Sequence, residues 1–327
     1  MDVVTPLWPR ELRLCFVTAN ILNGRSEVEA VRLIDAALDE GIRYFDTAPM
    51  YCGGHAERLV GPVAGRRQGK MFIATKVGML PPSTSLPARA ARRIARAAGV
   101  SPPAFAVAPS RQFKPAQVAA SLQTSLRALG KGRIDMLLLH EPKPEDITDD
   151  LLTLLQDCRD RGDIGQCGLA TGRQATNDIM SRYPGIFSYA QVPDAIDDRV
   201  EVAINHSAAS IIGSHSLLGE RFATLVRRLT EDDLMLARWQ SMLDIDGLDT
   251  SELARLFLAE ALDYNNTGPV LFSSGNARNV RANVRLLSEP IDRQRITTLR
   301  ALVQGMNRIK AEASPRDILQ SRALRSH

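Results

Sequence analysis

The chain has 327 residues, of which 44% are hydrophobic and 24% are charged, a balance typical of a globular protein rather than a disordered or membrane-embedded one. The net charge of +4 is modest and aromatic residues make up only 5%, so no broad basic surface or stacking platform indicates a nucleic-acid partner. No apolar run approaches the roughly 18 residues of a membrane span, and the four scattered cysteines form no CxxC pair typical of disulfide frameworks or zinc sites. We therefore expect a cytoplasmic protein without a secretory signal, a metal, a membrane contact or bound nucleic acid, and its oligomeric state stays open.

Short apolar runs alternate with helical patterns along most of the chain. The expected strands are Leu12–Thr18, Arg43–Thr47, Met71–Val77, Ile134–His140, Ile164–Ala170, Ser188–Val192, Ala209–Ser214 and Val270–Ser273. The expected helices are Ser26–Glu40, His55–Ala64, Pro115–Leu129, Thr148–Arg161, Gln174–Tyr183, a weak Ala195–Asn205, a long Leu217–Asn265 region and Asn276–Leu287.

Eight strand–helix alternations favour an α/β fold of the (β/α)₈ TIM-barrel type, formed as a single domain over residues 1–327. A doubly wound open sheet is the main rival, but it normally carries a glycine-rich turn after its first strand. That turn reads FVTANILNGRS here and lacks GxGxxG. Three segments extend the simple alternation: a long insertion over 80–113, extra helices before the eighth strand, and a C-terminal helical tail over 290–327.

Ionisable residues end three consecutive expected strands. They are Asp46, Lys76 and His140, and Tyr51 lies in the loop after the first of them. Each has an ordinary structural explanation, such as a turn cap, a surface lysine or a core histidine. Because the strands of a parallel barrel end at one mouth, their joint occurrence instead favours a single site. Asp46 can pair with Lys76, and we expect a nearby Lys76 to lower the pKa of Tyr51 toward neutrality, which suits a general acid and base.

Two longer segments resemble the aldo-keto reductase family. GIRYFDTAPMYCGGHAERLVG is similar to the family's DTA-x-x-Y-G segment and the helix after it, and VAASLQTSLRALGKGRIDMLLLHEP is similar to its second signature. The resemblance extends from about residue 12 to 287 and is weakest over 195–265. It implies a (β/α)₈ barrel, a nicotinamide cofactor bound without a Rossmann fold, and reduction of aldehydes or ketones.

The same resemblance implies roles for individual residues. The catalytic tetrad falls on Asp46, Tyr51, Lys76 and His140, with Tyr51 protonating the carbonyl oxygen as hydride reaches the carbon. Cys52 stands where the family usually has glycine, and we expect this change to alter loop packing more than chemistry.

Candidate contacts to the nicotinamide follow the later strands. The family's Ser-Asn pair after the fifth strand is replaced by Ala170 and Thr171, which leaves Thr171 as a substitute contact. Gln191 matches the glutamine of the sixth strand that holds the carboxamide. His215 and Ser216 stand where many members have an aromatic ring under the nicotinamide followed by serine, so an imidazole is expected to stack there.

The segment FSSGNARNVRANVRLL resembles the family's eighth strand and helix, where backbone N–H groups and a helix N-terminus receive phosphate. Asn279 occupies the position of an arginine that many members use for the 2′-phosphate, and Arg278 or Arg281 could serve instead. NADPH is therefore the expected cofactor. The remaining residues that match the family's phosphate segment are Ser274, Gly275, Asn276 and Asn283.

The leading functional hypothesis is an NADP-dependent enzyme that reduces an aldehyde or ketone, or catalyses the reverse reaction, with a small-molecule carbonyl or alcohol as substrate. A non-catalytic, nicotinamide-nucleotide-binding subunit that senses redox state is the first alternative. A barrel lyase that uses Lys76 as a Schiff base is the second.

The insertion over 80–113 is longer than one βα connection requires and follows the third strand. We expect it to form part of the substrate pocket's wall at the catalytic mouth, with a short helix near Ala88–Ala98 and apolar contacts from Phe105 or Phe113. Its arginine-rich run RAARRIAR is most simply a solvated helix face.

Overall fold

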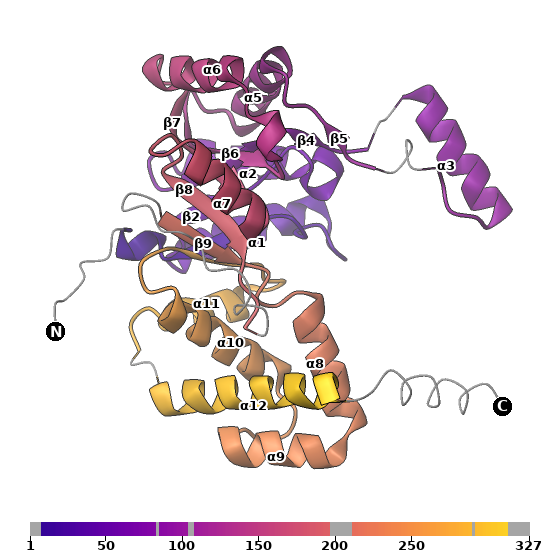
Figure 1. Cartoon of the computed structure of the whole chain (residues 1–327), viewed down its shortest axis with the longest axis vertical. Helices are drawn as coiled ribbons and strands as arrows, with labels where there is room; N and C mark the ends of the chain where they lie inside the picture. Colours follow the sequence, from indigo (N-terminus) through magenta and orange to yellow (C-terminus); the bar gives the residue numbers. More distant parts are fainter. Residues whose placement is uncertain (1–7, 83–84, 104–107, 197–210, 290–291, 313–327) are drawn as a thin grey trace.

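The structure is a computed structural model and describes residues 8–82, 85–103, 108–196, 211–289 and 292–312. Eight parallel strands close into a barrel in the order β1-β10-β9-β8-β7-β6-β3-β2, surrounded by helices (Figure 1). The expected (β/α)₈ barrel is confirmed. The doubly wound alternative is wrong because β1 pairs with both β2 and β10 and leaves no open edge.

All eight expected strands are present. Two further strands, β4 and β5, form a separate antiparallel pair at the base of the insertion. The bounds of the strands are β1 (Leu14–Val17), β2 (Tyr44–Asp46), β3 (Phe72–Val77), β4 (Met79–Leu80), β5 (Ser110–Arg111), β6 (Ile134–His140), β7 (Ile164–Ala170), β8 (Tyr189–Pro193), β9 (Ile211–His215) and β10 (Val270–Phe272).

The helices occupy the expected connections, and the long Leu217–Asn265 region divides into three of them. Short 3₁₀ turns cover Arg10–Leu12, Tyr51–Gly54 and Pro144–Asp146. The bounds of the α-helices are α1 (Glu27–Asp39), α2 (Ala56–Arg66), α3 (Leu86–Ala98), α5 (Pro115–Leu129), α6 (Asp149–Asp160), α7 (Arg173–Arg182), α8 (Glu220–Glu231), α9 (Asp233–Leu243), α10 (Thr250–Tyr264), α11 (Ala277–Arg285) and α12 (Arg293–Glu312).

Local sequence signals explain where the first helix starts. The Ser26 hydroxyl accepts a hydrogen bond from the Glu29 backbone N–H (3.3 Å), and the Glu29 carboxylate accepts one from the Ser26 N–H (2.8 Å). This reciprocal capping box satisfies two N–H groups that the first helical turn cannot pair internally. None of the helices in the described part of the chain combines the length and apolar character that a membrane crossing requires.

An aromatic cluster closes one end of the barrel. Trp8 stacks on Tyr189 with 5.8 Å between ring centroids, and the Tyr44 hydroxyl donates to the Tyr189 hydroxyl (3.4 Å). Gly213 makes room for this cluster, because a Cβ atom there would lie only 1.9 Å from the Tyr189 oxygen. With this end filled, a ligand can approach only the opposite end, where the strands finish.

The extra helices have a hydrophobic core of their own. Side chains from α8, α9, α10 and α12 pack around the buried Trp239 and Phe257, apart from the main core between barrel and outer helices. Figure 1 shows these four helices grouped at one end of the molecule. The helix α12 covers much of the expected C-terminal tail. The expected weak helix at 195–205 falls largely outside the described residues.

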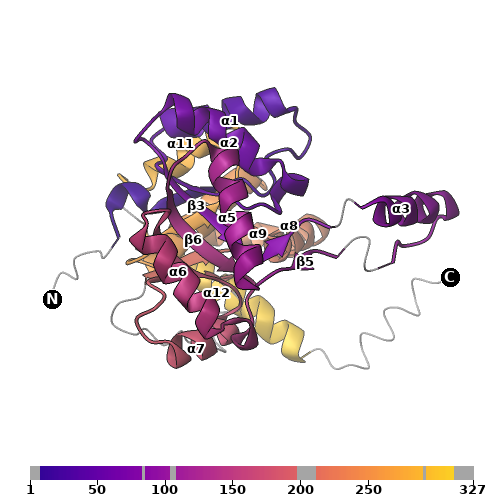
Figure 2. The same ribbon diagram turned by 90° about the horizontal axis from the view of Figure 1, so that it is seen from above.

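The insertion extends away from the barrel. The expected short helix is present as α3, which projects well beyond the other helices in both views (Figures 1 and 2). Phe113 is buried in the main core, where its ring fills the space beside Gly78; a Cβ on Gly78 would lie 2.2 Å from that ring. Phe105 lies outside the described residues.

Candidate active site

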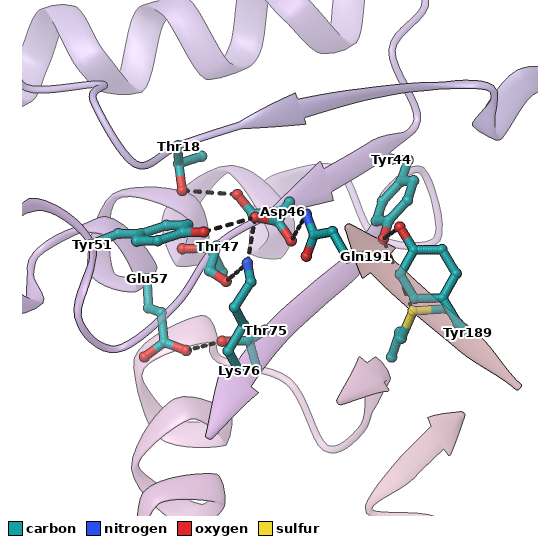
Figure 3. Close-up of polar contacts among 11 residues, drawn as sticks. Thr18, Tyr44, Asp46, Thr47, Tyr51, Glu57, Thr75, Lys76, Tyr189 and Gln191 are labelled. Carbon is teal, nitrogen blue, oxygen red and sulfur yellow. Dashed lines mark hydrogen bonds and ion pairs between the residues drawn. The ribbon is translucent and has the colours of Figure 1, made fainter. Parts of the chain in front are cut away.

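Neighbouring strands bring the three predicted strand-end residues together. Asp46 ends β2 and pairs in register with Ala74 of β3, while Lys76 of β3 pairs with Leu138 of β6, the strand that ends in His140. The Lys76 Nζ donates to Asp46 Oδ1 at 2.5 Å and to the Thr47 carbonyl at 3.2 Å (Figure 3). Both charged side chains are almost fully buried, so this is an ion pair removed from water.

The Asp46 carboxylate also receives two weaker hydrogen bonds. The Tyr51 hydroxyl donates to Oδ1 and the Gln191 amide donates to Oδ2, each at 3.4 Å (Figure 3). The carboxylate thus has donors on both oxygens. This arrangement offsets part of the cost of burying its charge.

The backbone after Tyr51 turns back toward β1 through left-handed conformations at Cys52 (φ 51°) and Gly53 (φ 64°). A left-handed conformation is costly for a residue other than glycine, so Cys52 adopts a backbone conformation that glycine would adopt without strain. The Cys52 thiol contacts the Thr18 and Ala19 carbonyls at 3.5 and 3.3 Å, which ties the Tyr51 loop to the β1–α1 connection.

Tyr51 lies directly beside the other members of the tetrad. The Lys76 Nζ is 4.6 Å from the centroid of its ring, and the His140 ring meets it edge-on with 6.0 Å between centroids. The structure therefore brings together all four residues that the sequence predicted as catalytic.

The expected direction of the Tyr51 pKa shift is wrong. Burial raises the pKa of Tyr51 to about 12, because desolvation of the phenolate outweighs the opposing influence of the Lys76 ammonium. The phenol consequently stays protonated at neutral pH. Burial lowers the pKa of Lys76, but Asp46 and Tyr51 together raise it to about 12, so its amine stays charged.

A buried carboxyl group supports the strand that carries Lys76. The Thr75 hydroxyl donates to Glu57 of α2 at 2.5 Å (Figure 3), and burial raises the pKa of Glu57. This contact joins α2 to β3 one residue before Lys76.

His140 is held neutral by its surroundings. Burial, followed by the Lys76 charge and His215, lowers the pKa of His140 to about 3. Its Nδ1 is buried without a hydrogen-bond partner among the described residues. A neutral imidazole has one donating and one accepting nitrogen, so it can donate a hydrogen bond to a substrate oxygen without carrying charge.

The depressed pKa of His140 predicts a pH-dependent stability. Between about pH 6.5, where histidine titrates in an unfolded chain, and about pH 3, the unfolded state binds a proton on His140 that the folded state does not. The free energy of unfolding should therefore fall as pH falls through this window. Urea denaturation at pH 7 and pH 5 should show a smaller loss for His140→Gln than for the wild type. Equal losses in the wild type and in His140→Gln would contradict the assignment.

A cavity of about 300 Å³ opens above the tetrad. Tyr51, Lys76 and His140 line it, as do the predicted cofactor residues Gln191, His215 and Ser216, whereas Thr171 does not. The sequence prediction missed Asn20 and Glu141, although Glu141 directly follows the strand-ending His140 and could have been noticed for that reason. The other lining residues are Val17, Ala19, Ala170, Leu217, Leu218, Gly219, Leu271, Phe272 and Ser273.

None of the described residues of the insertion lines this cavity. The expectation of an apolar pocket wall is therefore wrong for them. The reason is that Phe113 is used in the protein core, while α3 points outward (Figure 2).

The inner part of the cavity suits a carboxamide. Gln191 is buried, its Nε2 donates to Asp46, and its Oε1 has no partner among the described residues. An unpaired buried acceptor at a cavity wall is costly unless a ligand donates to it. His215 hydrogen-bonds to the Ser216 hydroxyl at 2.8 Å, and burial followed by the Lys76 charge lowers the pKa of His215 to about 4. The Thr171 hydroxyl instead contacts the Pro142 carbonyl and the Glu141 carboxylate, each at 3.4 Å.

The predicted phosphate segment follows β10. The Ser274 hydroxyl accepts from the Asn276 N–H (3.3 Å), and the Asn276 side chain accepts from the Asn279 N–H (2.8 Å), which caps the N-terminus of α11. Arg25 from the β1–α1 connection donates to the Gly275 carbonyl (3.1 Å) and occupies the space where a Cβ of residue 275 would lie. The sequence prediction did not include this arginine. It brings a cation to the segment.

The two candidate arginines for the 2′-phosphate differ in the structure. Arg281 forms a bidentate ion pair with Glu40 of the α1 C-cap, with contacts of 2.6 to 2.9 Å. Arg278 is exposed and forms no hydrogen bond or ion pair with the described residues. Arg278 is thus the arginine that remains available, and Asn283 lies one further turn along α11, partly buried.

A sequence model of the Aldo/keto reductase family matches residues 14–184, slightly more than half of the chain. The chain belongs to the aldo/keto reductase family. The matched segment includes the four residues of the tetrad and Thr171.

Curated relatives resemble this aldo/keto reductase over short segments. It is 46% identical over 55 residues to the pyridoxal 4-dehydrogenase of Microbacterium luteolum, which covers 17% of this chain and 16% of that protein. It is 32% identical over 135 residues to the D-threo-aldose 1-dehydrogenase of a Pseudomonas species, which covers 39% and 38%. The chain thus matches less than half the length of either relative.

Solved structures match over nearly the whole chain. The glycerol dehydrogenase of Gluconobacter oxydans aligns with a TM-score of 0.69 at 18% identity and covers 92% of this chain and 93% of that one. At this identity the likeness establishes the shared barrel fold alone.

Proposed function

We propose that this aldo/keto reductase is an NADPH-dependent oxidoreductase that reduces an aldehyde or ketone to an alcohol. The observation that carries the proposal is the buried Lys76–Asp46 pair beneath the Tyr51 phenol, next to a neutral His140 in one cavity. This arrangement provides a proton donor and a hydrogen-bond donor for the oxygen of a carbonyl group whose carbon is reduced.

Each residue of the tetrad has a distinct task in this reaction. Tyr51 donates its phenolic proton to the carbonyl oxygen, and the Lys76 ammonium stabilises the phenolate that remains. Asp46 holds the ammonium in place, and the neutral His140 donates a hydrogen bond that orients the carbonyl. In the reverse direction Tyr51 accepts the proton of the alcohol.

The residues around the cavity fit a nicotinamide. The unpaired Gln191 Oε1 can accept a hydrogen bond from the carboxamide, and His215 and Ser216 line the same cavity. A bound reduced nicotinamide supplies the hydride that the carbonyl carbon receives. Farther out, Ser274, Arg278 and the N-terminus of α11 form the proposed phosphate contacts.

The Schiff-base alternative is not favoured by the site. Such a lysine must be an uncharged amine to attack a carbonyl, whereas Asp46 and Tyr51 keep Lys76 charged. A redox-sensing subunit would bind the nucleotide without turnover.

Oxidation of NADPH in the presence of a panel of aldehydes and ketones tests the proposal directly. Steady turnover of at least one carbonyl compound is expected. Tight NADPH binding without turnover across the panel would favour the sensing function, and borohydride trapping of Lys76 would favour the lyase.

Cofactor choice provides a separate prediction. NADPH should bind at least about tenfold more tightly than NADH, a difference of roughly 1.4 kcal/mol, because Arg278 is free to pair with the 2′-phosphate. In fluorescence titrations, Arg278→Ala should reduce this preference. Arg281→Ala is the matched control and should retain it, since Arg281 is occupied by Glu40. Equal affinities for the two nucleotides, or an Arg281→Ala effect as large as that of Arg278→Ala, would refute the role of Arg278.

A further inference from the structure

Glu141 occupies a strained and well-fixed position at the cavity. Its backbone is left-handed, with φ 52°, which a residue other than glycine adopts only when its surroundings require it. Its N–H donates to the Ala170 carbonyl of β7 at 2.8 Å, and its carbonyl accepts from the Arg111 guanidinium at 2.8 Å. The peptide groups on both sides of the side chain are therefore anchored.

Arg111 is itself held on two sides. It donates to the Asp146 carboxylate, and its guanidinium lies over the Phe113 ring at 5.1 Å from the centroid. Arg111 belongs to β5 at the base of the insertion. The insertion thus reaches the cavity indirectly, by fixing the backbone of Glu141.

The Glu141 carboxylate accepts few contacts from the described residues of the protein. Its Oε2 accepts one long hydrogen bond, 3.4 Å from the Thr171 hydroxyl, and it forms no ion pair with the described residues. Partial burial raises the pKa of Glu141, and the Thr171 hydrogen bond and then the Arg111 charge oppose this shift only in part. A carboxylate at a cavity wall with an unused oxygen can accept hydrogen bonds from a ligand.

The remaining cavity wall offers no cation to an anionic substrate. Among the described lining residues Lys76 alone is positively charged, and Asp46 neutralises it. His140 and His215 are neutral at physiological pH because of their low pKa values. The nearest cation outside the lining, Arg111, is already paired with Asp146. A carboxylate on the substrate would therefore meet Glu141 with no unpaired cation among the described lining residues, which disfavours it electrostatically.

We propose that Glu141 is a specificity residue, which accepts a hydrogen bond from a substrate hydroxyl close to the reacting carbonyl and repels substrates that carry a carboxylate. The preferred substrate class is then a neutral, hydroxylated aldehyde or ketone. This inference rests on the proposed carbonyl reduction and specifies its substrate.

Two matched substrate pairs test the inference by kcat/KM with NADPH. Succinic semialdehyde and its methyl ester differ in charge, and glyceraldehyde and propanal differ in hydroxyl groups. We expect the wild type to prefer the ester and glyceraldehyde. Glu141→Gln should raise the ratio of semialdehyde to ester at least tenfold. Glu141→Ala should lower the ratio of glyceraldehyde to propanal at least fivefold.

The control variant is Glu145→Gln, which removes the same charge from an exposed side chain outside the cavity and should leave both ratios unchanged. NADPH affinity, measured by fluorescence, should stay within twofold of wild type in all variants. Unchanged ratios in both Glu141 variants, or equal effects of Glu145→Gln, would overturn the role of Glu141.

Failure of carbonyl reduction can be distinguished from failure of the role proposed for Glu141. If none of the four compounds is reduced by the wild type, carbonyl reduction is refuted for these substrates, and binding then decides the role of Glu141. In thermal-shift titrations, Glu141→Gln should strengthen binding of succinate relative to glycerol at least fivefold in the NADPH-loaded protein. Identical behaviour of wild type and variant would overturn the inference.

Discussion

Replacing Tyr51 with phenylalanine is expected to lower kcat for carbonyl reduction by about 10²–10⁴-fold, the usual contribution of a positioned general acid. The substitution removes the one phenol that lies beside Lys76 and His140, and it retains the ring that packs against both. NADPH affinity should change little. Steady-state kinetics and fluorescence titration measure the two quantities separately.

Tyr183 supplies the matched control for this substitution. Its hydroxyl donates to the Ile147 carbonyl at 2.9 Å, away from the cavity, so Tyr183→Phe removes the same atom without touching the site. Its kcat should be close to that of the wild type. If Tyr51→Phe keeps more than half of wild-type kcat, the proton comes from another group.

Lys76→Met is expected to lower the free energy of unfolding by about 3–5 kcal/mol, the usual cost of breaking a buried ion pair from one side. The variant leaves the Asp46 carboxylate buried without its closest donor. Carbonyl reduction should also be lost, because no ammonium stabilises the Tyr51 phenolate. Urea denaturation at neutral pH measures the stability and NADPH oxidation measures the activity.

Two further variants show whether the loss of stability comes from the unpaired charge. Lys143→Met, which removes an exposed lysine 3.9 Å from Glu145, should leave the urea midpoint nearly unchanged. The double variant Asp46→Asn/Lys76→Met should recover part of the stability, since neither charge remains buried, but no activity. A Lys76→Met midpoint equal to that of Lys143→Met would show that the pair contributes nothing to folding.

The sequence by itself determined the barrel and the convergence of the tetrad. The eight strands were recognisable because apolar runs and helical patterns alternate, and parallel strands in a barrel all finish at one mouth. For this reason Asp46, Lys76 and His140 could be placed together from their positions at strand ends alone. Gln191 could be assigned to the same site because it matches a family motif, and in the structure its amide donates to Asp46.

Tertiary structure alone decided the pKa shifts in the site and the partners of individual charged side chains. The pKa of Tyr51 rises because desolvation exceeds the influence of Lys76, and desolvation depends on how completely the surrounding elements exclude water. Arg281 is not available to the phosphate segment because it pairs with Glu40, a residue 241 positions away in the chain. Strand-end positions predict which residues share the barrel mouth, but they carry no information about pairs between outer helices, which depend on how the helices pack around the barrel.

The insertion and Glu141 illustrate the same limit. The sequence predicted the helix α3, because its pattern of arginine and alanine is local, but it did not predict that the helix points away from the cavity. Phe113 is drawn into the core by burial of its ring beside Gly78, while Arg111 from the same segment fixes the backbone of Glu141. Local patterns specify helices and strands through backbone preferences, whereas the direction of an insertion and the role of a carboxylate are set by long-range contacts that form only when the barrel closes.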